Sequence, residues 1–220
     1  MASHAKLFNQ LFSGPFVKNL ACAYKEIIHP NEDENEVTIL AQAGVELRDR
    51  CHEDRCIHDA VVSLFPCGGF ELSAAIEIKG IRRNLKHDQK MHKYLGATDT
   101  FFIAVPASNM SLAIAKINQD PSTKHLKGVI SITKGEIVIR PQVQKGIDRG
   151  RLTNLWDDII KKKVIPKGVD ARLLEFDVVT IPQDDFNNTN DWAMCDGLCI
   201  NAKYLSLYKR WKKDGKLNIA

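Results

Sequence analysis

The order of elements along the 220-residue chain predicts an α/β protein with a mixed central sheet flanked by helices. Apolar runs of strand length alternate with segments of helical periodicity, and two of the strand-like runs are separated only by a short Pro-Cys-Gly-Gly turn. The composition, 44% hydrophobic and 26% charged, is typical of a soluble globular protein with enough chain to bury a core.

Each expected element has a local signal in the sequence. Helices are expected where apolar residues recur every three or four positions, at residues 14–30, 36–50, 85–97, 109–120, 152–163 and 198–216. Strands are expected where β-branched and aromatic residues form short apolar runs, at residues 56–65, 70–79, 98–106, 128–132, 135–141 and 171–182. The first two strands should form a hairpin through the turn between them.

Two regions follow from this order. Residues 1–148 are expected to form the core domain, and residues 149–220 a C-terminal α/β elaboration that ends in a basic helix and packs on the core. From Ile200 onward there are six basic residues and one acid, although the whole chain carries a net charge of only +4. A second basic cluster covers residues 81–93. Such clusters on a near-neutral body indicate a polyanionic partner, the alternative being a solvated lysine-rich surface.

The sequence also bears on location. No stretch approaches the roughly 18 apolar residues of a membrane span, and the N-terminus lacks the apolar block of a signal peptide. A cytoplasmic protein with no membrane partner and with reduced cysteines is therefore expected. A split zinc site stays open as an alternative, although its spacing differs from the usual C-x2-C, and its ligands would be Cys51, His52, Cys56, His58, Cys195 and Cys199.

The candidate site lies at the end of the second hairpin strand. Glu77 and Lys79 flank Ile78, so a carboxylate and an ammonium project from the same face of an otherwise apolar strand. Asp59 lies near the start of the partner strand, at the same open end of the hairpin. Asp59 and Glu77 can therefore converge on Mg²⁺, for which Mn²⁺ would substitute, with the backbone carbonyl of Ile78 as a further ligand. Lys79 would position or activate a water and offset charge on a phosphoryl group.

These residues resemble the signature of the PD-(D/E)XK nuclease superfamily, an acid at the start of one strand followed by acid-x-lysine on the next. The segments "KHDQKMHKYLGATDTFFIAVP" and "LKGVISITKGEIVIR" extend the resemblance over residues 36–140, to a bacterial branch associated with DNA repair. The resemblance implies a restriction-endonuclease-like core and Mg²⁺-dependent hydrolysis of phosphodiester bonds by a restriction, repair or phage endonuclease. His58 departs from the signature, where a proline is common, and an E-x-K pair also occurs as a plain salt bridge.

The resemblance further implies an acid from the preceding helix. Glu36 is the candidate because, at 100° per residue, it falls at the centre of the stripe formed by Leu40, Ala43 and Leu47. The alternative is a helix-start acid favoured by the macrodipole. The expected catalytic residues are then Asp59, Glu77, Lys79 and Glu36.

DNA is the expected partner, reached through the two basic clusters. Phosphate contacts are expected from Arg82, Arg83, Lys86, Lys90, Lys209, Arg210, Lys212 and Lys213. A homodimer would suit an enzyme that cuts both strands, although one sequence does not establish it. Two other classes stay open: a non-catalytic relative that binds nucleic acid, and a protein-interaction module whose basic tail binds an acidic partner.

Overall fold

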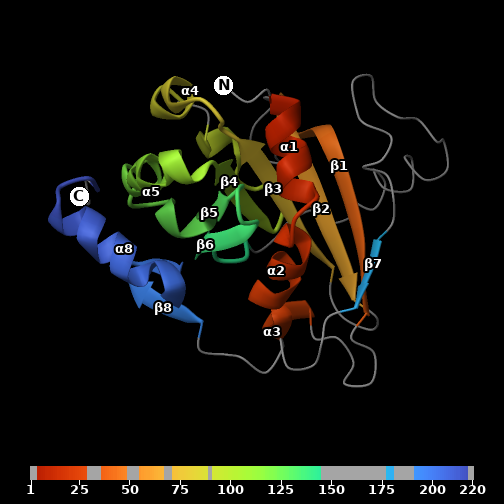
Figure 1. The fold of residues 1–220 in the computed structure, drawn as a ribbon. Coiled ribbons are helices and arrows are strands. Elements are labelled where there is room, and N and C mark those ends of the chain that lie inside the picture. The colour runs from red at the N-terminus through yellow and green to blue at the C-terminus, as the bar shows by residue number, and fades with distance from the viewer. Residues whose placement is uncertain are drawn as a thin grey trace.

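The computed structural model describes residues 4–28, 36–48, 55–66, 71–88, 91–144, 177–180 and 191–217. The strands in these segments form one nine-stranded sheet in the order β7-β1-β2-β3-β4-β5-β6-β9-β8 (Figure 1). Their bounds are β1 Glu36–Arg48, β2 Arg55–Pro66, β3 Leu72–Ile78, β4 Thr100–Val105, β5 Lys127–Ser131, β6 Glu136–Arg140, β7 Asp177–Thr180, β8 Trp192–Cys195 and β9 Leu198–Asn201. The expected α/β class with a mixed central sheet is thus confirmed.

The connections explain why the sheet is mixed. Strands β1, β2 and β3 form an antiparallel meander, whereas β4 is parallel to β3 and β5 is parallel to β4. Parallel neighbours need a crossover, which α4 (Arg82–Lys86) and the 3-10 helix η1 (Met91–Tyr94) supply after β3, and α5 (Met110–Asn118) after β4. The remaining neighbours β6, β9 and β8 are antiparallel again.

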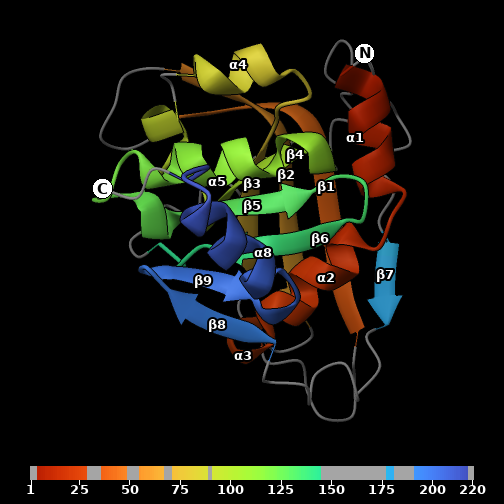
Figure 2. The same cartoon turned by 60° about the vertical axis from the view of Figure 1, so that its left-hand side comes forward.

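Helices cover both faces of the sheet and bury two apolar cores. On one face lie α1 (His4–Phe12), α2 (Phe16–Ala23) and α3 (Lys25–Ile28), and this core includes Ile76 and Ile78 of β3. On the other face lie α4, α5 and the C-terminal α8 (Ala202–Lys213), whose core includes Ala75 (Figure 2). All seven residues of β3 are buried, and Glu77, next to Ile76, shares the second face with Ala75.

The expected helix at 36–50 is wrong, because this segment is the long strand β1. Val37 and Ile39 are both buried in the first core, which is the period of a strand. The segment is rich in β-branched residues, and it pairs with β2 over nearly its whole length. The spacing of Leu40, Ala43 and Leu47 was therefore coincidental, and the helical argument for Glu36 does not hold.

Most other expected elements are confirmed. The hairpin of β2 and β3 forms in the expected order, α2, α3, α5, β4 and β6 lie within their expected segments, and β5 begins one residue before its expected segment. The expected helix at 85–97 overlaps only the last two residues of α4 and contains the short 3-10 helix η1, and residues 198–201 form β9 before the terminal helix begins. The expected helix at 152–163 lies outside the described residues. No helix of the described segments is long and apolar enough to cross a membrane.

The described parts of residues 149–220 complete the sheet at both edges, because β7 pairs with β1 and β9 pairs with β6. The β8–β9 turn contains Asp196 and Gly197, both with positive φ, as a two-residue hairpin turn requires. Asp196 accepts hydrogen bonds from Tyr208 at 3.0 Å and Lys212 at 2.8 Å, which fix α8 to this turn. Tyr208 is fully buried, so α8 docks on the sheet through the face that carries this ring.

A close approach between α2 and the β5–β6 turn predicts an unequal pair of glycine substitutions. Gly135 has a φ of +63°, and a Cβ there would lie 2.8 Å from the backbone nitrogen of Phe16. Gly215 has a similar φ of +65° with nothing within 4 Å of an added Cβ. Gly215→Ala should therefore cost only the backbone strain, about 1 kcal/mol, and Gly135→Ala at least about 1 kcal/mol more. Urea denaturation followed by circular dichroism measures both, and equal losses would contradict the steric argument.

Candidate functional site

A cluster of charged and polar side chains lies where β3 leaves the sheet. The ammonium of Lys79 is 2.6 Å from Oε1 of Glu77 and 3.0 Å from Oδ2 of Asp88. The exposed fractions of these side chains are only 16% for Lys79, 8% for Glu77 and 5% for Asp88. The E-x-K pair is therefore a largely buried ion pair that a second carboxylate joins, and Lys79 is its most accessible member.

Tyr94 and His58 form the inner wall of this cluster. The hydroxyl of Tyr94 donates to Oε1 of Glu77 at 3.4 Å, and its ring stacks on Phe101 with centroids 5.5 Å apart. The ring of His58 lies 5.4 Å from that of Tyr94 and is fully buried. Neither ring nitrogen of His58 has a hydrogen-bond partner among the described residues. His58 thus packs as a buried neutral ring and does not reach a surface where it would meet a phosphate.

Asp59 lies beside Glu77 on the neighbouring strand, as the hairpin predicted. Its Oδ2 accepts a hydrogen bond from the backbone N–H of Ile78 at 2.7 Å. The N–H of Lys79 points the other way and donates to Ala104 of β4 at 2.9 Å. Because the N–H and C=O of one strand residue point to the same side, the carbonyl of Ile78 also points toward β2 and Asp59. The structure therefore brings Asp59, Glu77, Ile78 and Lys79 together.

The electrostatics of the cluster are set by burial and by its excess of carboxylates. Burial and the charge of Asp59 raise the pKa of Glu77, partly opposed by Lys79. Burial alone would lower the pKa of Lys79, but Glu77 and Asp88 together raise it above its ordinary value. Lys79 therefore keeps its proton at neutral pH. This favours a role as a fixed positive charge and hydrogen-bond donor over a role as a base.

The donor set fits a hard divalent cation. Two carboxylates, Glu77 and Asp88, hold the single ammonium, Asp59 lies beside Glu77, and Oε2 of Glu77 is buried without a hydrogen-bond partner among the described residues. Such an acceptor has lost its hydration and gains from a cation. Within the described segments no group of three or more His, Cys, Asp or Glu side chains is spaced to hold a metal. A site there would use two carboxylates, a carbonyl and water, a set that Mg²⁺ readily accepts.

Glu36 lies far from this cluster. It pairs with Thr180 at one end of β1, whereas the β1–β2 register places Asp59 opposite Gly44. Eight residues of strand separate Glu36 from Gly44, which at about 3.3 Å per residue is roughly 26 Å. The structure therefore does not bring Glu36 to the other three expected catalytic residues.

The two basic clusters lie on the same face of the sheet. Arg82, Arg83 and Lys86 are exposed on α4, directly after the cluster at the end of β3. The exposed basic residues of α8 include the expected Lys209, Arg210, Lys212 and Lys213, and Lys203 at the start of the helix is also exposed. In both views α5 lies between α4 and α8 (Figures 1 and 2). Lys90 lies outside the described residues.

Only some of the ligands of the alternative zinc site lie among the described residues. Cys195 and Cys199 are free thiols, and burial and the neighbouring Asp196 raise the pKa of Cys195, which disfavours the thiolate that zinc requires. Cys51 and His52 lie outside the described residues.

Sequence reasoning gave no role to two acids that the structure makes prominent. Asp88 follows Lys79 by nine positions, and its segment matched the family-like pattern, which was the available signal. Asp99 is 1% exposed and accepts hydrogen bonds from the N–H and hydroxyl of Ser73 at 2.8 and 2.7 Å. It fastens the start of β4 to β3, at the opposite end of the strand from Glu77.

Comparisons with protein-family models, with curated proteins and with solved structures each returned no match. The nuclease resemblance therefore rests on the residues quoted above and on their geometry.

The buried imidazole predicts a pH-dependent stability. Burial lowers the pKa of His58 from 6.5 to about 4, partly opposed by Asp59. Between these values the unfolded chain binds a proton that the folded protein does not, so folding loses stability as pH falls from 6.5 toward 4. In metal-free buffer, the free energy of unfolding should drop by about 2 kcal/mol more between pH 7 and 4.5 in the wild type than in His58→Phe. Urea denaturation at each pH measures the free energy of unfolding of both proteins. If the two free energies fell in parallel with pH, His58 would bind its proton in the folded state as it does in the unfolded chain.

Proposed function

We propose that this protein is a Mg²⁺-dependent nuclease that hydrolyses phosphodiester bonds, acting on DNA as an endonuclease. The observation that carries the proposal is the meeting of Asp59, Glu77 and Lys79 at one end of a buried hairpin, where one carboxylate oxygen of Glu77 has no hydrogen-bond partner in the described part of the chain. A plain surface salt bridge would not need a second strand's acid beside it. A restriction-endonuclease-like core is part of the same proposal.

In this proposal Asp59, Glu77 and the carbonyl of Ile78 hold the metal. Asp59 has one oxygen committed to the N–H of Ile78, which fixes its orientation. Glu77 has Oε1 committed to Lys79 and Tyr94, so Oε2 is the oxygen left for the ion. When bound, Mg²⁺ supplies Lewis-acid polarisation of the phosphodiester and a more acidic water.

Lys79 acts as the cationic group of the cluster, and its side chain is more exposed than those of Glu77 and Asp88. Its raised pKa keeps the ammonium charged, so it can donate a hydrogen bond to the scissile phosphate or to the attacking water. It also offsets the negative charge that develops on the phosphoryl oxygens. Asp88 and Glu77 hold the ammonium from two sides, which fixes its position before the substrate arrives.

The substrate path follows from the exposed cations. Arg82, Arg83 and Lys86 stand directly after the cluster, and the basic residues of α8 lie on the same face of the sheet. A DNA backbone that passes α4 would therefore meet the cluster at its exposed end. Phosphate contacts of this kind position the duplex and do not specify its sequence.

Metal-dependent cleavage tests the proposal. The protein is incubated with supercoiled plasmid, linear duplex and single-stranded circular DNA, with Mg²⁺, with Mn²⁺ and with EDTA. Asp59→Asn, Glu77→Gln and Lys79→Gln should each reduce cleavage by about 100-fold or more, because each removes a charge that acts on the transition state. Calorimetry should show that only the two acid variants lose Mg²⁺ affinity.

The control is Glu26→Gln on α3, which removes a carboxylate from the opposite face and should cleave normally. Circular dichroism must show that the variants are folded, because a broken buried ion pair can itself unfold a protein. Unchanged turnover in Glu77→Gln would remove the metal-site assignment. Salt-sensitive DNA binding with no cleavage would favour the non-catalytic relative instead, and binding only to an acidic protein would favour the interaction module.

The salt dependence of binding tests whether α8 belongs to the DNA path. A triple variant, Lys209→Gln, Arg210→Gln and Lys213→Gln, leaves the Lys212–Asp196 ion pair intact. The slope of log affinity against log salt should flatten by about 0.9 for each duplex phosphate that the variant no longer neutralises. The control neutralises Lys6 and Lys18, on the helices of the opposite face. If the salt-dependence slope of the triple variant were unchanged, α8 would not contact the DNA, and the DNA path would pass α4 alone.

A further inference from the structure

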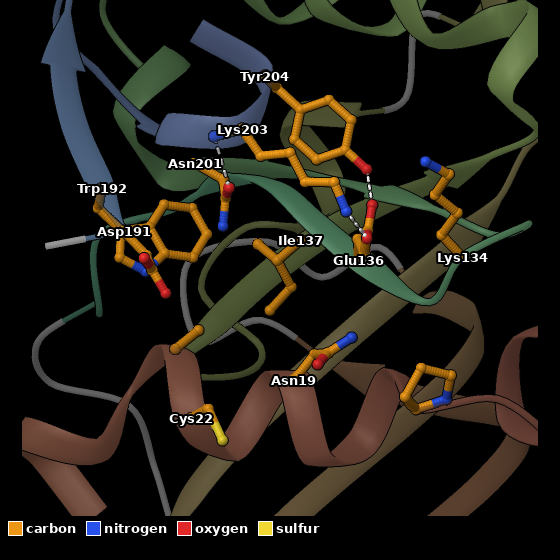
Figure 3. Close-up of a pocket in the computed structure, with 12 residues that line it drawn as sticks. Asn19, Cys22, Lys134, Glu136, Ile137, Asp191, Trp192, Asn201, Lys203 and Tyr204 are labelled. Atoms are coloured by element: carbon orange, nitrogen blue, oxygen red, sulfur yellow. Dashed lines mark hydrogen bonds and ion pairs between the residues drawn. The ribbon is translucent and has the colours of Figure 1, made fainter. Parts of the chain in front are cut away.

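A cleft lies between α2 and the start of α8 (Figure 3), and none of its lining residues belongs to the nuclease-like cluster of Asp59, Glu77, Lys79 and Asp88. Its volume is about 440 Å³, within the range of small-molecule sites. The floor is β6 and the side walls come from three segments that are far apart in the sequence: α2, the β5–β6 turn, and residues 191–204. Strand β6 is three positions from β3 in the sheet, roughly 14 Å at the usual strand spacing.

The walls of this cleft are fixed in place by the fold. The side chain of Asn19 donates to the carbonyl of Gly135 at 2.8 Å, and a Cβ at Gly135 would collide with the α2 backbone. On the other side, Glu136 of β6 accepts hydrogen bonds from both Lys203 and Tyr204 of α8. The two helices are therefore tied to adjacent residues, Gly135 of the β5–β6 turn and Glu136 of β6, so the cleft is preformed.

Several polar groups in the cleft are not used by the fold. The amide nitrogen of Asn19 donates to Gly135, so its carbonyl oxygen is the group that can accept a hydrogen bond from a ligand. The side-chain oxygen of Asn201 accepts from the N–H of Lys203, so its amide nitrogen is the group that can donate to a ligand. The exposed side chains of Asp191 and Lys134 also line the cleft and form no ion pair with any described residue.

An aromatic ring lies among these groups. The guanidinium of Arg140 lies 5.2 Å from the ring centroid of Trp192, and this half-buried ring also lines the cleft. Figure 3 shows the ring and the side chains of Asn201 and Asp191 at one end, and Lys134 at the other. A planar group could stack on the indole, while an anionic group at its far end would meet the exposed ammonium of Lys134.

We propose that this cleft binds a single nucleotide unit, with its base against Trp192 and its phosphate at Lys134. The acceptors on Asn19 and Asp191 and the donor on Asn201 suit the mixed hydrogen-bonding edge of a base. The nucleotide can come from a free nucleoside monophosphate or from an unstacked end of a single strand, because both present the same chemistry. The inference stands apart from the nuclease proposal, since the residues of the two sites do not overlap.

The test uses isothermal titration calorimetry with dAMP, with deoxyadenosine, and with a 5′-phosphorylated four-residue oligo-dA. The expected result is saturable binding of dAMP, of the oligonucleotide, or of both, and the ratio of the two affinities distinguishes the free nucleotide from the strand end. Lys134→Gln should weaken dAMP binding about 10-fold while leaving deoxyadenosine unchanged, because only dAMP carries the phosphate. Trp192→Leu should weaken binding of every probe about 10-fold, because the base then has no indole to stack on.

Two controls keep the test decisive. Lys116→Gln removes a lysine on α5, across the sheet from the cleft, and should bind dAMP as the wild type does. Asp59→Asn changes the nuclease-like cluster and should also leave dAMP binding unchanged, so failure of one proposal does not imply failure of the other. Because Trp192→Leu also removes the interaction with Arg140, Lys134→Gln serves as the variant with an intact fold. The proposal is overturned if neither dAMP nor the oligonucleotide binds saturably, or if Lys134→Gln binds dAMP with wild-type affinity.

Discussion

The ammonium of Lys79 lies between the carboxylates of Glu77 and Asp88, and this interaction fixes how the chain leaves the buried strand β3. β3 is central to the sheet and fully buried, so the charged end of the strand must be neutralised within the protein. Asp88 does this from the segment after α4, and thereby holds the crossover against the sheet. Removing one partner of such a buried arrangement costs about 3–5 kcal/mol, because the other charges stay buried without compensation.

The opposite end of β3 is fastened by neutral hydrogen bonds and one acid. Asp99 binds Ser73, and the hydroxyl of Thr98 accepts from the N–H of Ala75 at 3.1 Å and donates to the carbonyl of Thr100 at 2.7 Å. These hydrogen bonds set the register between β3 and its parallel neighbour β4. With both ends held, the side chain of Glu77 has a defined position relative to Asp59, which a metal site requires.

The sequence predicted the parts of the site that depend on short-range pattern. The two-residue spacing of Glu77 and Lys79 and the hairpin that carries Asp59 follow from strand period and turn chemistry, and both are found. The prediction for Glu36 was wrong because the apolar residues of segment 36–48 fit both the helical and the strand period. Only pairing with β2 decides between the two structures. Asp88 could not be placed, since its ion pair with Lys79 depends on the path of α4. The cleft near Trp192 is formed by three segments that are far apart in the sequence. A local sequence pattern does not predict that such segments lie side by side.

The C-terminal hairpin and α8 connect the two sites to the same framework. Residues 192–201 add two strands beyond β6, and Leu198, Ile200 and Tyr208 are buried in the core on the face of the sheet that holds Glu77. The same segment supplies Trp192, Asn201 and Lys203 to the cleft by α2. Its apolar residues therefore complete one core, while its polar residues build the wall of a cleft on the other side. The basic surface of α8 is a consequence of this docking, because burial of Tyr208 directs the neighbouring Lys209 and Arg210 outward. The terminal segment is thus part of the sheet, and its charge is held in a fixed position relative to α4 and α5.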